Sequence, residues 1–182
     1  MALTRKTLTA AAAAVALGSG VAAAGDPENT LLMDLEDGRV VIELRPDLAP
    51  SHVARIKELT RQGFYDGTPF HRVIDGFMAQ GGDPTGTGTG GSGQKLAAEF
   101  SKEHHVRGTA SMARAADPNS ADSQFFIVFA AAPWLDGQYT IWGRVVEGME
   151  VVDQIKRGSG QSGTVKEPDR ILRLQVAADG EE

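Results

Sequence analysis

The chain has 182 residues, with 24 acidic and 18 basic side chains, a formal net charge of −6 and no cysteine. This length suits a single domain, and a hydrophobic content of 41% supplies a buried core, which excludes a globally disordered chain. The lack of cysteine excludes disulfides, thiolate zinc ligands, thiol nucleophiles and lipid-modified cysteine, and the acidic balance argues against binding to a nucleic-acid backbone.

The first 24 residues have the layout of a secretory signal peptide. Arg5 and Lys6 precede a short apolar stretch, which is followed by the small residues Ala22–Ala24. The stretch is shorter than the roughly 20 residues that a membrane-spanning helix needs. We therefore expect residues 1–24 to be cleaved. Residues 25–182 are expected to form one domain that is monomeric, periplasmic and without membrane insertion, with full secretion as the alternative.

Two segments near the start of this domain alternate between apolar and polar residues. Residues 30–36 and 39–45 each place every second side chain on one apolar face, as a half-buried strand does. The apolar positions are Leu31, Met33, Leu35, Val40, Ile42 and Leu44. Asp37-Gly38 lies between the segments and is a strong tight-turn dipeptide, so the pattern predicts a β-hairpin.

A helix is predicted to follow the hairpin. Pro50 suits the first turn of a helix, where the N–H that proline lacks would have no partner. Val53, Ile56 and Leu59 then recur at helical spacing and form one apolar stripe. Gly63 favours termination of the helix at that point.

From residue 64 onward the chain shows short β segments broken by glycine. These segments are 69–74, 76–82, 108–114, 123–130 and 138–146. In the fourth segment, alternation predicts that Phe125, Ile127 and Phe129 enter the core. A second short helix is expected over 149–156. A last strand is expected in 170–177, with its inward side chains at Leu172, Leu174 and Val176. Many short strands and two helices predict a mainly β barrel or sandwich.

Glycine-rich and histidine positions offer weaker indications of function. Residues 86–91 match G-x-G-x-x-G, but no helix begins after them and no Lys-Ser/Thr follows, so a flexible turn is favoured over a phosphate site. The histidines match no familiar metal-site spacing, and no metal is expected. His52 is expected to be solvated, and His104 and His105 are expected to lie in a surface turn.

Five segments carry a specific resemblance. They are FHRVI at 70–74, GFMAQGGD at 76–83, SMA at 111–113, NSADSQFFI at 119–127 and WLDG at 134–137. In this order and spacing the chain resembles a cyclophilin-type peptidyl-prolyl cis-trans isomerase from Thr30 to Val176. The resemblance implies a closed eight-stranded antiparallel barrel capped by two α-helices, with an active groove on its outer wall. It also implies an enzyme that assists protein folding without a cofactor.

The resemblance also implies the residues of the site. Arg72 and Gln80 correspond to catalytic positions. The substrate-binding positions are Phe77, Met78, Ala113, Arg114, Gln124, Phe126, Trp134, Leu135 and Tyr139. The amide before proline resists rotation by about 18–20 kcal/mol because resonance is lost on twisting. A rigid, permanently charged guanidinium aimed at the pyramidal nitrogen would favour the twisted form over either planar form.

Two positions depart from the best-known members of the family. Tyr139 stands where they carry histidine and Arg114 where they carry asparagine, which resembles the bacterial, exported branch. Trp134 favours cyclosporin-type inhibitors, while the two departures predict weakened inhibition. The expected partners are proline-containing polypeptides and unfolded exported proteins, and no nucleic acid is expected. The alternative is a chaperone module that binds proline segments without significant catalysis.

Overall fold

The computed structural model describes residues 25–180, so the predicted signal peptide lies outside the described residues. The strands are β1 (Thr30–Leu35), β2 (Gly38–Leu44), β3 (Arg72–Ile74), β4 (Met78–Gly81), β5 (Thr109–Met112), β6 (Phe125–Val128), β7 (Ile141–Glu147) and β8 (Arg173–Val176). The helices are α1 (Pro50–Arg61) and α2 (Met149–Val152), with 3-10 turns η1 (Pro27–Asn29), η2 (Pro133–Leu135) and η3 (Ala177–Asp179).

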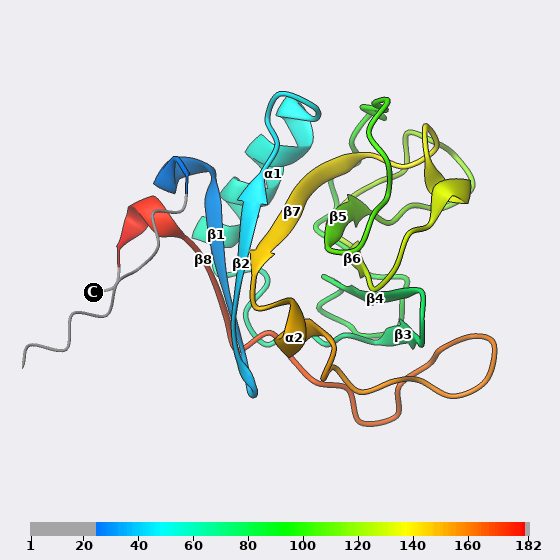
Figure 1. Ribbon diagram of the computed structural model, residues 1–182. Helices are drawn as coiled ribbons and strands as arrows, with labels where there is room; N and C mark the ends of the chain where they lie inside the picture. The colour runs from blue at the N-terminus through cyan, green and yellow to red at the C-terminus, as the bar shows by residue number, and fades with distance from the viewer. Residues whose placement is uncertain (1–24, 181–182) are drawn as a thin grey trace, which may run out of the picture.

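All eight strands belong to one antiparallel sheet in the order β3-β4-β6-β5-β7-β2-β1-β8. The sheet curls into a half-barrel (Figure 1), with α1 contacting β8 and α2 contacting β2. Among the described strands β3 and β8 are the two edges and do not pair with each other. The fold is therefore mainly β with two helices, as predicted, but the expected closure of the barrel is wrong.

The chain that leads into β8 explains why the sheet stays open. Its backbone runs beside β3 and bonds there: the Val73 N–H donates to the Gly163 carbonyl and the Val165 N–H donates to the His71 carbonyl. This segment contains Pro168, which has no N–H to donate to a ladder. Isolated bridges such as Arg72 with Thr164 therefore cover the β3 edge in place of a regular strand.

The predicted hairpin and first helix are confirmed. The alternating apolar side chains of both strands are buried. Leu35 pairs with Gly38, so the two-residue turn is Glu36-Asp37, one residue earlier than the predicted Asp37-Gly38. α1 begins at Pro50 and buries Val53, Ile56 and Leu59. Within residues 25–180, no helix is long and apolar enough to cross a bilayer.

His52 is the exception on α1, because it is fully buried where solvation was expected. The carboxylate of Glu99 accepts hydrogen bonds from the backbone N–H groups of Ser51 and His52 at the helix N-terminus, both at 3.0 Å. The Nδ1 atom of His52 lies 2.6 Å from the same carboxylate. An acidic cap from a distant loop therefore satisfies the free amides of the first turn and holds the imidazole inward.

Two expectations near the C-terminus need correction. α2 ends at Val152, earlier than expected, because the next turns close through tighter bonds such as that from the Ile155 N–H to the Val152 carbonyl. Leu172 is 59% exposed, although Leu174 and Val176 are buried as predicted. Regular alternation starts only at Arg173, and Ile171 enters the core in place of Leu172.

Alternation along β6 separates two apolar clusters. Phe125, Ile127 and the following Phe129 belong to the main core inside the curl, as predicted. Phe126 and Val128 face the other way and join a smaller cluster. The remaining buried members of that cluster are Met78, Ala132 and Leu135. The outer wall of the sheet therefore carries its own apolar floor.

Candidate active site

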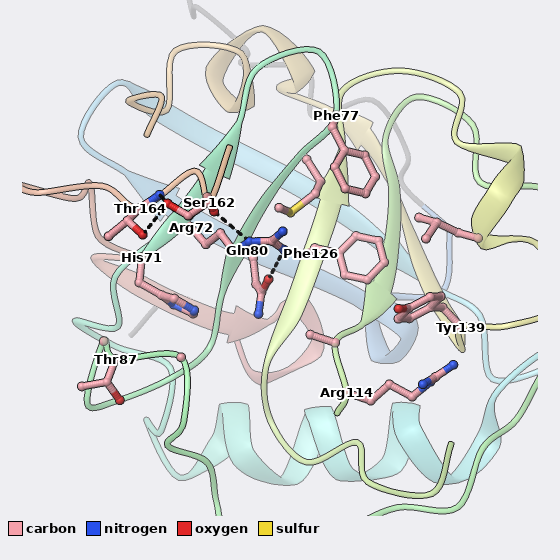
Figure 2. Close-up of a pocket in the computed structure, with 15 residues that line it drawn as sticks. His71, Arg72, Phe77, Gln80, Thr87, Arg114, Phe126, Tyr139, Ser162 and Thr164 are labelled. Carbon is pink, nitrogen blue, oxygen red and sulfur yellow. Dashed lines mark hydrogen bonds between the residues drawn. The ribbon is translucent and has the colours of Figure 1, made fainter. Parts of the chain in front are cut away.

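A cavity of about 650 Å³ opens over this outer cluster (Figure 2). Of the residues expected in the site, it is lined by Arg72, Phe77, Met78, Gln80, Ala113, Arg114, Phe126, Leu135 and Tyr139. Gln124 and Trp134 do not line it, but each contacts a residue that does. The lining also includes residues that were not expected: His71, Gly86, Thr87, Gly88, Ser162 and Thr164.

One half of the cavity is apolar. Met78 and Phe126 form its floor and are almost fully buried. The Phe126 ring meets the Tyr139 ring edge-on at a centroid distance of 5.8 Å. Phe77 is partly buried against the same cluster, and its ring lies 5.6 Å from that of the exposed Trp134. Closely packed aromatic walls of this kind offer a ring-sized apolar ligand a preformed place to bind.

The other half is polar and centres on Arg72 (Figure 2). Arg72 and Gln80 are register partners on β3 and β4, so their side chains emerge side by side. The Nη1 group of Arg72 donates to Gln80 Oε1 at 3.2 Å, and its Nε group donates to the Ser162 carbonyl at 3.0 Å. Both acceptors are neutral, so the guanidinium charge is held in place at the groove without being compensated by a carboxylate.

Gln80 in turn contacts Gln124, which lines a smaller neighbouring cavity together with Gln80. The Nε2 group of Gln80 donates to Gln124 Oε1 at 3.0 Å. The Nε2 group of Gln124 then donates to the carbonyls of Gly88 and Gly90, at 3.0 and 2.9 Å. A continuous series of hydrogen bonds therefore runs from the glycine-rich loop to Arg72.

The glycine-rich loop is not the flexible turn that its composition favoured. Asp83 is fully buried beneath it and accepts bonds from Thr85, Gly88 and Gly90. Burial alone would raise the pKa of the Asp83 carboxyl, but the hydrogen bonds from Thr85 and the two glycine amides outweigh burial and hold that pKa below its usual value. An ionised carboxylate therefore organises the loop that borders the cavity.

Arg114 and Tyr139 form the far wall. The Arg114 guanidinium carbon lies 4.5 Å from the centroid of the Tyr139 ring, a cation–π arrangement. The Nη2 group of Arg114 also donates to the Gln138 carbonyl at 2.8 Å. The two residues that replace the familiar asparagine and histidine are thus packed against each other, and the arginine lies along the wall.

The two adjacent histidines differ from each other, which corrects the expectation of a simple surface turn. His104 is exposed, whereas His105 is buried and its ring is stacked against Phe126 at 6.3 Å. Both rings contact the carboxylate of Asp136 through Nδ1, at 2.7 and 3.0 Å. The backbone N–H of His105 and the two rings together lower the pKa of Asp136 to about 2.

Asp136, His105 and Ser111 are arranged in the sequence of contacts that a serine hydrolase uses. The His105 Nε2 atom lies 3.1 Å from Ser111 Oγ. However, Ser111 is fully buried and its hydroxyl donates to the Thr140 carbonyl. A substrate has no access to that oxygen, so the arrangement supports the floor of the groove and offers no nucleophile.

Within residues 25–180 no cluster of three or more acidic, histidine or cysteine side chains could hold a metal ion.

The sequence missed the groove residues that lie outside the recognisable segments. Ser162 and Thr164 reach the cavity only because the chain before β8 runs along β3. Thr87 and Gly88 were present in a glycine-rich loop whose structure depends on Asp83. The acidic residue in QGGD was the available indication that this loop is anchored, since aspartate readily accepts bonds from nearby backbone amides.

Comparisons with known proteins agree with this geometry. A sequence model of the family described as "Cyclophilin type peptidyl-prolyl cis-trans isomerase/CLD" matches residues 30–176. A probable peptidyl-prolyl cis-trans isomerase of Brucella suis is 54% identical over 190 residues, covering 96% of this chain and 97% of the relative. A peptidyl-prolyl cis-trans isomerase of Synechococcus elongatus is 41% identical over 150 residues, covering 81% and 96%.

Solved structures give the same result. A cyclophilin from Hirschia baltica superimposes with a TM-score of 0.77 at 30% identity, covering 86% of this chain and 76% of that one. A cyclophilin-type isomerase of Cryptosporidium parvum, crystallised in the presence of the dipeptide Ala-Pro, gives a TM-score of 0.75 at 32% identity, covering 81% and 98%. The chain therefore belongs to the cyclophilin-type peptidyl-prolyl cis-trans isomerases, enzymes that catalyse rotation about the peptide bond preceding proline.

Proposed function

We propose that the outer groove isomerises X-Pro bonds in polypeptides, and that Arg72 stabilises the twisted amide. The observation that carries this assignment is the geometry of Arg72, whose charge is fixed by two neutral acceptors beside an apolar pocket. Neither contact uses Nη2, so a donor is available to a substrate in the groove. Gln80 belongs to the same catalytic arrangement because it holds Nη1.

The reaction needs no covalent step. Rotation must overcome about 18–20 kcal/mol of lost resonance, and at the top of that barrier the prolyl nitrogen regains a lone pair. A donor aimed at this lone pair binds the twisted form more strongly than either planar form, which is the requirement for acceleration. A rate increase of about 10⁵ needs roughly 7 kcal/mol.

The apolar half of the groove supplies the binding energy. We assign the proline ring to the pocket of Phe77, Met78, Phe126 and Leu135, in accord with the crystallisation of a relative in the presence of Ala-Pro. Ala113 and Gln124 lie beside this pocket and are assigned to the peptide main chain. Replacing Phe126 by alanine should raise KM, because the floor of the pocket is lost. The circular dichroism spectrum should stay unchanged, because the main core on the other face of β6 remains.

The decisive test is a proline-isomerisation assay on residues 25–182 with and without Arg72→Ala. Removing a donor that acts on the transition state should lower kcat/KM by about 100-fold or more, with the circular dichroism spectrum unchanged. The alternative is a module that binds proline segments without catalysis. In that case, suppression of aggregation of an unfolded client would be the main activity, and isomerisation by the wild-type protein would be as slow as that by Arg72→Ala.

Inhibition by cyclosporin-type macrocycles follows from the same groove. Trp134 is 59% exposed and offers an apolar surface and an N–H donor beside Phe77. Arg114 lies against Tyr139 and lends charge and bulk to the opposite wall, so we expect measurable but weakened inhibition. In an inhibitor titration Trp134→Phe should weaken inhibition and Tyr139→His should strengthen it. The proposal fails if Trp134→Phe leaves inhibition unchanged, or if Tyr139→His does not strengthen it.

We further propose that the protein belongs to the bacterial, exported branch of the family. The support is the signal-peptide layout of residues 1–24. The mature domain, a monomer starting at Gly25, would then assist the folding of unfolded exported proteins in the periplasm, or outside the cell if it is fully secreted. Intact-mass spectrometry of protein isolated from its native host should give a chain that begins at Gly25. A chain that retains Met1 or Ala2 would contradict the export proposal.

A further inference from the structure

Asp83 lies outside the groove but is joined to it by hydrogen bonds. We propose that Asp83 is a positioning residue for isomerisation, which sets the orientation of Arg72 through the glycine-rich loop, Gln124 and Gln80. This inference rests on the proposed role of Arg72. It assigns to the loop a part in catalysis that does not require the loop to touch the reacting bond.

The first step is the hold of Asp83 on the loop. Its Oδ1 atom accepts from the backbone N–H and the hydroxyl of Thr85, at 2.8 and 2.7 Å. Its Oδ2 atom accepts from the N–H groups of Gly88 and Gly90, at 2.7 and 3.1 Å. Four bonds to one buried, ionised carboxylate fix the backbone of the loop firmly, because bonds to a charged acceptor are stronger than neutral ones.

Glycine makes this close approach possible. A Cβ atom on Gly90 would overlap Asp83 Oδ1, and Gly88 has a φ of +86°, in the left-handed region that favours glycine. The loop therefore closes over the carboxylate only with these residue types. The sequence suggested that these glycines form a flexible turn. In the structure they allow the loop to bind Asp83 closely and so make the loop rigid.

The second step passes from the loop to Gln124. With their N–H groups held by Asp83, Gly88 and Gly90 present their carbonyls to Gln124 Nε2, at 3.0 and 2.9 Å. Both donors of that amide are then used, so its Oε1 atom must face Gln80. A primary amide has nearly the same shape after a half-turn, so its orientation is set by its partners.

The third step fixes Arg72. Because Gln80 donates through Nε2 to Gln124, it turns its Oε1 atom to Arg72 Nη1, at 3.2 Å. If the glycine carbonyls turned away, both amides could rotate, and an NH₂ group would then face the guanidinium. Two groups of donors cannot bond to each other, so Arg72 would lose one of its two anchors. The loop thus determines the polarity of the whole series.

A second carboxylate, which precedes β6 and accepts hydrogen bonds from the same loop, provides a matched control. Asp122 accepts from the N–H and hydroxyl of Ser92, both at 2.6 Å, and from the N–H of Gly93 at 3.0 Å. It anchors the far end of the loop with three hydrogen bonds, whereas the buried Asp83 anchors the near end with four. None of its donors belongs to the residues whose carbonyls meet Gln124, so a purely structural role is expected for it.

The experiment compares Asp83→Asn with Asp122→Asn by measuring kcat and KM for isomerisation with NMR exchange. We expect Asp83→Asn to lower kcat by about tenfold or more with KM nearly unchanged, since a small misplacement of a catalytic group costs this much. Asp122→Asn should keep kcat within about twofold of wild type, although it also removes hydrogen bonds from a charged acceptor to the loop. Equal values of kcat in the two variants would overturn the proposal.

A double-mutant cycle shows whether the effect passes through Gln124. In a Gln124→Ala background, Asp83→Asn should cause no further loss of kcat, because the series is already interrupted. Additive losses would mean that Asp83 acts by another route and would overturn the proposal. If Asp83→Asn does not fold, Gly90→Ala replaces it and Gly91→Ala becomes its control, since added Cβ atoms at these adjacent positions meet Asp83 and Asp122 respectively.

Failure of this inference can be distinguished from failure of the proposed function. If Arg72→Ala retains wild-type activity, Arg72 is not the donor and both conclusions fall. If Arg72→Ala is inactive while Asp83→Asn behaves like Asp122→Asn, only the positioning role of Asp83 is wrong.

Discussion

The active groove and the two ends of the domain are each organised around an arginine, but the two arginines have opposite kinds of partner. Arg72 in the groove is held by the amide oxygen of Gln80 and the carbonyl of Ser162, both neutral. Arg61 near the termini is held by the carboxylates of Glu28 and Asp179. If Arg72 acts as we propose, the difference separates an arginine that serves catalysis from one that serves structure.

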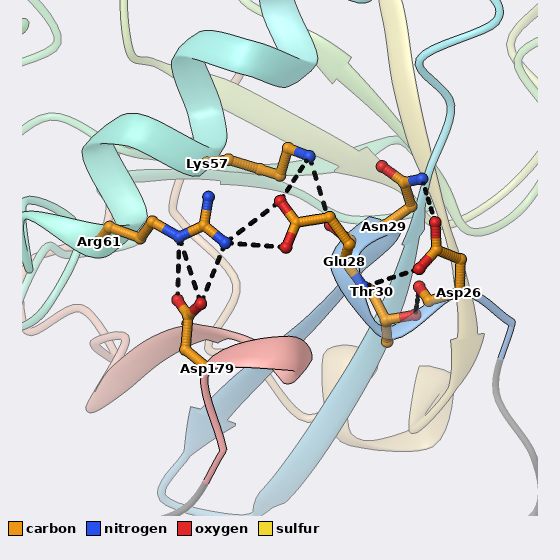
Figure 3. A network of polar contacts seen from close by, with 7 residues as sticks. All are labelled: Asp26, Glu28, Asn29, Thr30, Lys57, Arg61 and Asp179. Carbon is orange, nitrogen blue, oxygen red and sulfur yellow. Dashed lines mark hydrogen bonds and ion pairs between the residues drawn. The ribbon is translucent and has the colours of Figure 1, made fainter.

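The network at the termini, which we call the terminal clasp, consists of Glu28, Lys57, Arg61 and Asp179 (Figure 3). Arg61 Nη2 lies 2.9 Å from Glu28 and 3.0 Å from Asp179, and Lys57 Nζ lies 3.0 Å from Glu28. The clasp joins η1 and η3 to α1, so both ends of the domain are tied to one helix. Its charges neutralise one another, whereas the charge of Arg72 stays available to a substrate.

The sharpest test of this comparison is the same conservative change in both networks. Arg72→Lys should lower kcat/KM by about tenfold or more, because a single ammonium cannot reproduce the planar group that bonds Gln80 and Ser162 and still leaves a donor for substrate. Arg61→Lys should leave kcat/KM unchanged, since a point charge still attracts both carboxylates. The measurement is the isomerisation rate of each variant over a range of substrate concentrations.

Thermal unfolding provides the control for these two variants. Both should keep a Tm close to that of wild type, because neither exchange removes a charge or opens a cavity. If Arg72→Lys had full activity, a positive charge alone would suffice in the groove, and the distinction drawn from its geometry would fail.

A smaller effect is expected from deleting the clasp. Arg61→Ala should lower Tm by no more than a few degrees, because the side chains of Arg61, Glu28 and Asp179 are all about two-fifths exposed and exposed ion pairs contribute little. The loss should shrink in high salt, which screens such pairs. Activity should stay at the wild-type level, and a loss of kcat would show that the termini and the groove are coupled.

Strand β6 in the groove and helix α1 beside the clasp show how much of the structure the sequence could predict. The faces of β6 were predictable because alternation within one strand already separates Phe125 and Ile127 from Phe126. The burial of His52 was not, since it depends on Glu99, which lies 47 residues away and caps the helix. Periodicity reports the faces of an element but not the distant group that covers one of them.

The same distinction applies to the groove and to the closure of the sheet. Phe77 and Gln80 were found because they lie in contiguous segments that resemble the family. Ser162 was not, because it reaches Arg72 through a carbonyl, and any residue type can supply a backbone carbonyl. The open edge of the sheet was missed for a related reason, since isolated bridges beside β3 leave no alternating pattern in the sequence.

The smallest expected effect is the response of the clasp to acid. Hydrogen bonds from Arg61 and then Lys57 hold the pKa of Glu28 below its ordinary value of 4.5. A carboxyl with a lowered pKa in the folded state binds fewer protons there than in the unfolded chain. Its contribution to the free energy of unfolding is therefore present above about pH 4.5 and is lost as the pH falls through the lowered pKa.

Glu28→Gln isolates this contribution, because the amide keeps the shape of the side chain but does not titrate. In urea unfolding at a series of pH values, wild type should be slightly more stable than Glu28→Gln near neutral pH, and the difference should shrink below about pH 4.5. The isomerisation rate of the two proteins should agree at neutral pH, since none of the four clasp residues lines the groove. A difference in stability that is the same at every pH would show that Glu28 acts through its shape and not through its charge, and the clasp would then no longer be an electrostatic counterpart of the groove.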